Sequence, residues 1–291
     1  MSIHFRRTTC RLCNSPEVEL VLTMKPSALA DAYVPAEKLN EPQPAFPMDV
    51  YLCRNCGHAQ LLDVIDPKVL FANYLYVTSV SLGLVEHFRK YADAVVAKIA
   101  PKPGSLAIDI GSNEGVLLRF FKERGLKVLG VDAAGNVAAR ANQAGIETIS
   151  AFFSTDLARK IKAERGGAAI VTANNVFAHA DNLPDMLDGI RELLAPDGVF
   201  VFEVIYLADM LQKLTFDTIY HEHLCFHSVK PFQSFCQRHG MTLFHVEHIA
   251  SKGGSIRGYA KRADGPAKVD PSVENFLKME AEAGLDRPDG R

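Results

Sequence analysis

The sequence predicts an α/β fold in which helices cover both faces of a mostly parallel sheet, preceded by a small cysteine-containing module. Three observations support this prediction. Short apolar runs alternate with amphipathic stretches between residues 106 and 204. Two Cys-x-x-Cys pairs lie near the N-terminus. The composition, with 48% hydrophobic and 23% charged residues among 291, is that of an ordinary globular protein.

The alternating region contains five predicted strands with helices between them. The strands are Leu106–Ile110, Lys127–Asp132, Ile146–Ser150, Ala168–Asn174 and Val199–Val204. The helices are Val116–Arg124, Val137–Ala144, Asp156–Glu164 and Pro184–Leu194. This order is typical of a parallel sheet whose strands are joined by crossover helices.

Further elements flank the alternating region. Apolar residues recur at helical spacing from Ser79 to Ala100. Thr242–Glu247 and Ser255–Ala260 predict a hairpin at the sheet edge, turned by glycines between them. A last amphipathic helix runs from Val273 to Ala283.

These elements predict three parts of the chain. The first, residues 1–72, is rich in proline and holds the paired cysteines. We expect little apolar core in it, so that something other than burial holds it together. The sheet domain then covers residues 73–263, and a C-terminal helix and tail cover residues 264–291.

Charge and hydropathy exclude several classes of protein. With 32 basic and 34 acidic side chains, the net charge of −2 argues against a nucleic-acid or membrane-surface partner. No apolar run reaches the ~18 residues that span a bilayer. Residues 1–10 lack the apolar core of a signal peptide. We therefore expect a cytoplasmic protein.

The two cysteine pairs predict a structural zinc site. Cys10 and Cys13 form one Cys-x-x-Cys knuckle, and Cys53 and Cys56 form the other. Two such knuckles supply four thiolates in a tetrahedron, which leaves no open coordination position for catalysis. Gly57 allows the sharp turn after the second knuckle.

Other interpretations of the cysteines are weaker. A redox motif has one such pair at a helix start in a βαβ unit, a context that neither pair has. His58 could replace a cysteine ligand, although it is more simply a neighbour of the knuckle. Cys225 and Cys236 are interpreted as ordinary half-buried thiols.

A glycine loop follows the first strand of the sheet, with Asp109 before it and Gly111 and Gly115 within it. A dinucleotide loop has a glycine where Asn113 stands, and Glu114 places an anion where phosphates would lie. The loop therefore favours a phosphate-free ligand with a cationic centre, which is S-adenosylmethionine. An unliganded turn is the alternative.

Other residues near the strand ends fit the same ligand. Asp132 ends the second strand, where an acidic residue can accept both ribose hydroxyls. Phe152, Phe153 and Asn174 follow the third and fourth strands, where adenine and the methionine end would lie, although core packing is an equal interpretation of the two phenylalanines. After the fourth strand the Asn/Asp-Pro-Pro-Tyr signature of base methylation is absent.

Proton-handling residues concentrate after the fifth strand, in the segment from Tyr220 to His227. The carboxyl ends of parallel strands form the ligand crevice of such sheets, and this segment begins there. His221, Glu222 and His223 do not have the His-Glu-x-x-His spacing of a zinc protease. Surface histidines without a role are the alternative.

With these motifs in order, the chain resembles the nucleotide-sugar C-methyltransferases, in particular the NDP-hexose C-3 methyltransferases. The resemblance runs from residue 10 to about residue 285. It rests on the cysteine pairs, Tyr74-Leu-Tyr76 to Glu86-His-Phe88, Asp109 to Gly115, Phe216 to His223, and Gly253-Gly-Ser-Ile-Arg257. It implies a class I methyltransferase fold that uses S-adenosylmethionine.

The resemblance also implies roles. His223 would be the general base, with Tyr220 and Glu222 beside it. His179 would face the sugar from the end of the fourth strand, and Tyr76 lies in the segment that would close over the substrate. The reaction implied is methylation of C-3 in a 4-keto nucleotide-linked deoxysugar through an enolate, and a histidine with a pKa near ~6.5 suits that proton.

Two further expectations accompany this interpretation. The family continues with a second Rossmann-like domain after the helix near Ala283, where this sequence ends, so we expect the nucleotide-sugar cleft to be incomplete. The alternative functions are an O- or N-methyltransferase of another small molecule and a non-catalytic interaction protein.

Overall fold

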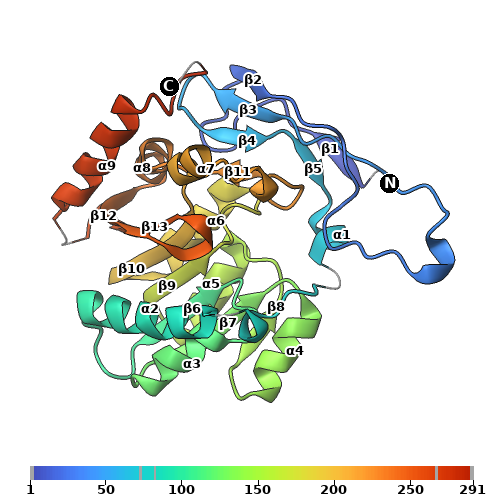
Figure 1. Ribbon diagram of the computed structural model, residues 1–291. Helices are drawn as coiled ribbons and strands as arrows, with labels where there is room; N and C mark the ends of the chain where they lie inside the picture. Colours follow the sequence, from blue (N-terminus) through green and yellow to red (C-terminus); the bar gives the residue numbers. More distant parts are fainter. Residues whose placement is uncertain (1–2, 72–73, 82, 266–267, 289–291) are drawn as a thin grey trace.

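The structure is a computed structural model that describes residues 3–71, 74–81, 83–265 and 268–288 (Figure 1). Its centre is a sheet in the order β12-β13-β10-β9-β6-β7-β8. These strands are β6 (Leu106–Ile110), β7 (Lys127–Asp132), β8 (Thr148–Ser150), β9 (Ala168–Asn174), β10 (Leu194–Ile205), β12 (Met241–Ile249) and β13 (Ser255–Arg262). Strands β6 to β10 are parallel, and β13 is antiparallel to both of its neighbours. The predicted sheet and its hairpin edge are confirmed.

Helices cover both faces of this sheet because its strands alternate apolar side chains between the two faces (Figure 1). Ala107 packs with α2 (Leu84–Ile99) and α3 (Val116–Glu123), whereas Ile108 and Ile110 pack with the opposite layer. The remaining helices are α1 (Pro67–Phe71), α4 (Gly135–Gln143), α5 (Thr155–Arg165), α6 (Leu183–Leu193), α7 (Leu207–Lys213), α8 (Val229–Arg238) and α9 (Pro271–Glu282).

The N-terminal module is built from short strands that pack against the larger domain. They are β1 (His4–Arg6), β2 (Val18–Leu22), β3 (Val50–Cys53), β4 (Ala59–Leu61) and β5 (Asp63–Ile65). Strand β11 (Cys225–Phe226), from the C-terminal half of the chain, pairs with β4 and extends the β4-β3-β2 sheet.

The expectation that the module has little apolar core is wrong. Every residue of β3, β4 and β5 is buried, and Leu52 and Leu61 belong to the same core as Ile108 and Leu187. The module gains this burial from the larger domain, which its composition alone did not show.

Several predicted boundaries shift. The helix expected from Ser79 begins at Leu84, because Gly83 before it has a left-handed φ of 79°. Strand β8 begins at Thr148 instead of Ile146. Cys225 and Cys236, expected to be half-buried, are 2% and 0% exposed. None of the helices in the described ranges is long and apolar enough to cross a bilayer.

Candidate active site and metal centre

A cavity of about 480 Å³ opens at the carboxyl ends of β6, β7 and β9. The glycine loop lines one part of it, and the segment that contains Tyr220, Glu222 and His223 lines another. Parallel strands end at the same edge of a sheet, so motifs more than a hundred residues apart in the sequence meet there. The predicted ligand loop and the predicted proton-handling cluster therefore share one cavity.

The glycine loop adopts a conformation that requires its two outer glycines. Gly111 has φ of +70°, and a Cβ there would lie 2.4 Å from Cγ2 of Val176. Gly115 has φ of +77°, and its Cβ would lie 2.8 Å from Cγ2 of Ile146. Both contacts are shorter than real Cβ contacts, and L-residues rarely adopt such φ values. The loop thus turns directly from β6 into α3.

Two buried carboxyl groups line the cavity next to this loop. Thr172 Oγ1 donates a hydrogen bond of 2.6 Å to Asp109, and burial raises the pKa of Asp109 to about 7. Asp132 accepts from the backbone N–H groups of Asn113 (2.8 Å) and Ala134 (2.9 Å), and burial also raises its pKa. The cavity therefore offers acidic groups at two strand ends.

Other predicted binding residues line the same cavity. Neither Nδ2 nor Oδ1 of Asn174, at the end of β9, has a hydrogen-bond partner among the described residues. Phe152 is 46% exposed, whereas Phe153 packs partly against the core. Buried amides are normally paired, so Asn174 is the kind of group that a ligand would satisfy.

The segment of residues 74–81, here called the strap, lies across the glycine loop. Asn113 accepts from the N–H of Thr78 (3.1 Å) and donates to the carbonyl of Tyr76 (3.0 Å). Glu114 accepts from the N–H of Ser79 (2.7 Å). The two residues that depart from a dinucleotide loop therefore hold the strap, a role that the sequence did not indicate.

His223 is held in one tautomer. Its Nδ1 lies 2.7 Å from the carbonyl oxygen of Thr218, which can only accept, so Nδ1 carries the proton. Its Nε2 has no hydrogen-bond partner among the described residues and is free to accept a proton. Burial lowers the pKa of His223 to about 4, although the bond to Thr218 opposes that shift. The imidazole is therefore neutral at physiological pH.

The neighbours of His223 are the residues that the resemblance named. The ring centroids of Tyr220 and His179 lie 4.1 and 4.9 Å from that of His223. Nδ1 of His179 is 3.7 Å from the carboxylate of Glu222, and burial holds the pKa of His179 well below its usual value. Burial raises the pKa of Glu222 to about 7. Ser81 Oγ donates to the Tyr76 hydroxyl (2.9 Å).

The other histidines of this segment lie away from the cavity. Nε2 of His221 donates to the carbonyl of Phe46, and Nε2 of His227 donates to the carbonyl of Phe177, each at 3.0 Å. His58 lies beside His227, with ring centroids 5.4 Å apart, and is not grouped with the cysteines. These histidines pack within the protein.

Sequence reasoning missed several residues of the cavity wall, among them Asp31 and Lys252. Asp31 belongs to the long excursion between β2 and β3, and Lys252 belongs to the turn between β12 and β13. Asp31 has no neighbouring motif, and the Gly253-Gly-Ser-Ile-Arg257 motif directly after Lys252 gave that lysine no role. Only the folded arrangement brings them to the cavity.

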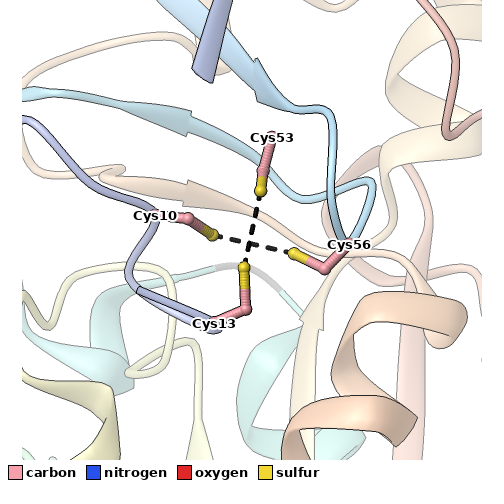
Figure 2. A group of neighbouring side chains, drawn as sticks. All are labelled: Cys10, Cys13, Cys53 and Cys56. Carbon is pink, nitrogen blue, oxygen red and sulfur yellow. Dashed lines mark hydrogen bonds between the residues drawn. The ribbon is translucent and has the colours of Figure 1, made fainter. Parts of the chain in front are cut away.

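The four cysteines of the two knuckles converge on one point (Figure 2). Their sulfur atoms lie within 4.8 Å of one another, with Cys10 and Cys56 at 3.7 Å and Cys13 and Cys53 at 3.5 Å. A tetrahedral zinc with Zn–S bonds of about 2.3 Å needs S···S separations of about 3.8 Å. All four thiols are free of disulfides, so the donor set fits a structural zinc ion.

The first knuckle is connected to the cavity through Arg11, which is only 2% exposed. Its Nε donates to Asp181 at 3.0 Å, and its Nη1 donates to the carbonyl of Leu61. Asp181 lines the cavity and also accepts from Arg7. Arg11 thus connects the first knuckle to the cavity wall.

Comparison with protein families agrees with this arrangement. A family model described as "Methyltransferase domain" matches residues 84–246, more than half of the chain. A second, described as "Putative zinc binding domain", matches residues 10–71. The predicted combination of a cysteine module and a methyltransferase fold is confirmed.

Individual relatives support the same assignment. The chain is 36% identical over 276 residues to C-methyltransferase NovU of Streptomyces niveus, a match that covers 95% of this chain and 66% of the relative. It therefore spans about two thirds of the length of that protein.

Among solved structures, the PH0226 protein of Pyrococcus horikoshii shares the fold, with a TM-score of 0.52 and 14% identity over 64% of this chain and 94% of that one. The magnesium protoporphyrin IX methyltransferase of Synechocystis, solved with bound SAH, matches with a TM-score of 0.47 and 16% identity over 67% of this chain and 91% of that one. The family model matches more than half of the chain, and the glycine loop and sheet order of the chain agree with it, so this chain belongs to the methyltransferase-domain family.

Proposed function

We propose that the chain transfers the methyl group of S-adenosylmethionine to a carbon atom. The substrate proposed is a 4-keto nucleotide-linked deoxysugar, methylated at C-3, with His223 as the general base. The observation that carries the proposal is the imidazole of His223, which lines the same cavity as the glycine loop and whose Nδ1 alone is committed to a hydrogen bond. The relative at 36% identity is named a C-methyltransferase.

The glycine-loop side of the cavity supports S-adenosylmethionine as the cofactor. Asp109 would face its ammonium group, Asp132 its ribose hydroxyls, and the unpartnered amide of Asn174 its methionine end. Phe152 and Phe153 offer apolar surface to adenine. When bound, the cofactor supplies an electrophilic methyl group on a sulfonium.

The other side of the cavity supports carbon as the methyl acceptor. A C–H group beside a ketone becomes nucleophilic only after losing its proton, which Nε2 of His223 would take. The electron pair of that C–H bond then forms the enolate, whose oxygen Tyr220 and His179 could stabilise with hydrogen bonds. The enolate carbon would then take the methyl group that a bound cofactor supplies, leaving its sulfur as a neutral thioether, and the ketone would return.

The direct test is a reaction of the purified chain with S-adenosylmethionine and a dTDP-4-keto-6-deoxyhexose. We expect a product heavier by one methyl group and an equal amount of S-adenosylhomocysteine, measured by mass spectrometry. The same reaction with substrate deuterated at C-3 identifies C-3 as the carbon whose hydrogen is lost, because the product then lacks the deuterium. Cofactor binding without turnover on any such sugar would contradict the proposed substrate and favour an interaction protein.

The raised pKa of Asp109 predicts how cofactor binding depends on pH. A cationic ligand requires the carboxylate, but the pKa of about 7 leaves Asp109 mostly protonated below neutral pH. Affinity should therefore fall as the pH falls, by about ten-fold at pH 6 relative to its plateau. Calorimetric titration of S-adenosylmethionine between pH 5.5 and 8.5 measures this.

The matched control for this prediction is Asp109→Asn, because an asparagine oxygen can still accept the hydrogen bond from Thr172. The amino group of the ligand titrates equally in both experiments, so the difference between the two proteins isolates the Asp109 carboxyl. Identical pH dependence in wild type and variant would show that Asp109 does not face the cationic centre.

We also propose that zinc bound by Cys10, Cys13, Cys53 and Cys56 is structural. All four donors are cysteine thiolates, which fill the coordination shell and leave no position for substrate. The division of the chain at residues 72 and 263 is likewise a proposal. Strand β11 joins the module's sheet although it follows the first boundary in the sequence.

A further inference from the structure

Lys252 lines the cavity from the turn between β12 and β13. No residue of this turn has a role in the proposed function. It is an exposed residue whose backbone has φ of 50° and ψ of 40°, the left-handed conformation that glycine adopts more easily. Glycines occupy the next two positions, yet a long cationic side chain stands here. The conformation directs this lysine toward the cavity wall.

Hydrogen bonds hold the turn in this form. Lys213 donates to the carbonyl of Gly253 (2.6 Å), and both Ser255 Oγ (3.0 Å) and the Gly254 N–H (2.9 Å) donate to the carbonyl of Ser251. A Cβ at Gly254 would lie 2.3 Å from Cγ of Asp209, so the chain passes against α7 without room for a side chain. The backbone at Lys252 is therefore fixed.

The neighbours of the Lys252 ammonium group are the proton-transfer residues. Its Nζ lies 5.6 Å from the ring centroid of Tyr76. Lys252 lines the same cavity as His179 and His223, and its charge contributes to lowering the pKa of both imidazoles. Among the described residues that line the cavity it is the only lysine or arginine, and none of the described residues accepts a hydrogen bond from it or pairs with it.

The carboxylate of Glu203 is the anionic group that acts on Lys252 from within the protein, but it is already paired with His87 and Arg257. A cation that forms no ion pair of its own, beside the proposed base, indicates that its anionic partner comes from the substrate. We propose that Lys252 is a catalytic residue whose ammonium group stabilises the negative oxygen of the enolate formed when His223 removes the C-3 proton. This rests on the proposed function and adds a charge that the neutral groups Tyr220 and His179 do not supply.

The step balances with the groups already named. The C–H electron pair moves into the enolate, whose oxygen becomes negative, while the proton goes to Nε2 of His223. Lys252 keeps its protons throughout and offers a positive charge where the negative charge develops. As the enolate carbon takes the methyl group, the oxygen returns to a ketone and the pairing with Lys252 weakens. Selective binding of the anionic state accelerates its formation.

The diphosphate of a nucleotide sugar is the other anion that Lys252 could bind. The observations favour the enolate, because the neighbours of Lys252 are Tyr76, His179 and His223. The two roles differ in kinetics. A phosphate contact is present equally before and during the reaction and affects KM, whereas a contact with the enolate affects kcat.

The test compares Lys252→Met, which removes the charge, with Lys252→Arg, which keeps it. Substrate is incubated with S-adenosylhomocysteine in deuterated water, and exchange at C-3 is followed by NMR, so that enolate formation is measured without methyl transfer. We expect Lys252→Met to lower both exchange and kcat by about 100-fold with KM little changed. Lys252→Arg should keep at least a tenth of the wild-type rates.

Lys90→Met, on the outer side of α2 with a side chain 70% exposed, is the matched control and should equal wild type. A Lys252→Met variant that folds with the wild-type melting temperature but keeps kcat and exchange within about three-fold would overturn the proposal. So would a raised KM with unchanged kcat, which would assign Lys252 to the diphosphate. A wild-type chain without exchange on any 4-keto nucleotide sugar would overturn the proposed function as well.

Discussion

Replacing His223 with asparagine is expected to slow methyl transfer by about 10²- to 10⁴-fold, the usual contribution of a general base. The reason is specific to this ring. Its Nδ1–H is committed to the carbonyl of Thr218, so Nε2 is the atom left to take a proton. Asparagine can donate the same hydrogen bond from its amide nitrogen. Its amide oxygen, however, is far too weak a base to remove a C–H proton.

The measurement separates chemistry from binding. S-adenosylhomocysteine should bind His223→Asn as it binds wild type, because His223 is on the other side of the cavity from the glycine loop. Exchange of the substrate C-3 proton with deuterated solvent should fall together with kcat. His239→Asn, at the C-terminal end of α8, provides a control in which a histidine outside the cavity is replaced in the same way.

Two results would count against His223 as the base. One is turnover by His223→Asn within about ten-fold of wild type. The other is normal solvent exchange with slow methyl transfer, which would mean that another group forms the enolate. Because burial holds the pKa of His223 near about 4, wild-type activity lost to protonation already at pH 6 would also point to a different group.

Replacing Cys53 with serine is expected to release the metal and destabilise the protein by at least about 4 kcal/mol, since zinc binding contributes directly to folding. This corresponds to a melting temperature lower by about 6 °C or more. Cys53 ends β3, which lies at the centre of the module's sheet between β2 and β4. Loss of the metal should therefore loosen the strands that pack on the larger domain.

The effect should reach the cavity. Arg11, between two of the cysteines, bonds to Asp181 in the cavity wall, and β4 pairs with β11 just beyond His223. Cys53→Ser should therefore weaken binding of substrate more than binding of S-adenosylhomocysteine. The residues proposed to bind S-adenosylhomocysteine lie at the ends of β6, β7 and β9, outside the module. Metal analysis, calorimetric unfolding and ligand titration measure these three effects.

Cys236→Ser provides the matched control, because Cys236 is a buried thiol in α8 outside the cluster. It should keep one zinc ion per chain and lose little stability. The zinc assignment would be refuted if Cys53→Ser kept stoichiometric zinc and the wild-type melting temperature. Zinc-free wild-type protein that unfolds normally would refute it equally.

Much of the site could be predicted from local sequence because each motif has local geometry. The Cys-x-x-Cys knuckles and the loop from Gly111 to Gly115 are short turns whose residue types are required by their own φ angles or donor chemistry. The five parallel strands followed from the spacing of apolar runs. The family resemblance named Tyr76, His179, Tyr220, Glu222 and His223 in advance, and all five line one cavity.

What could not be predicted depends on distant segments. Glu114 was interpreted as a group that would repel the phosphates of a dinucleotide, but its carboxylate accepts a hydrogen bond from the backbone N–H of Ser79 in the strap. The module was expected to lack a core, yet its strands are buried because β11 and the larger domain cover them. Lys252 stands directly before the motif that begins at Gly253, but that motif gave the lysine no role.

By itself, the sequence determined the fold class, the pairing of the cysteines into two knuckles and the turn of the glycine loop, because these depend on periodicity and on residues a few positions apart. Tertiary structure alone decided which histidines face the cavity, which tautomer His223 adopts, and that Lys252 lies beside it. Those facts depend on packing between elements far apart in the chain, where burial and a single carbonyl oxygen set the chemistry of a side chain.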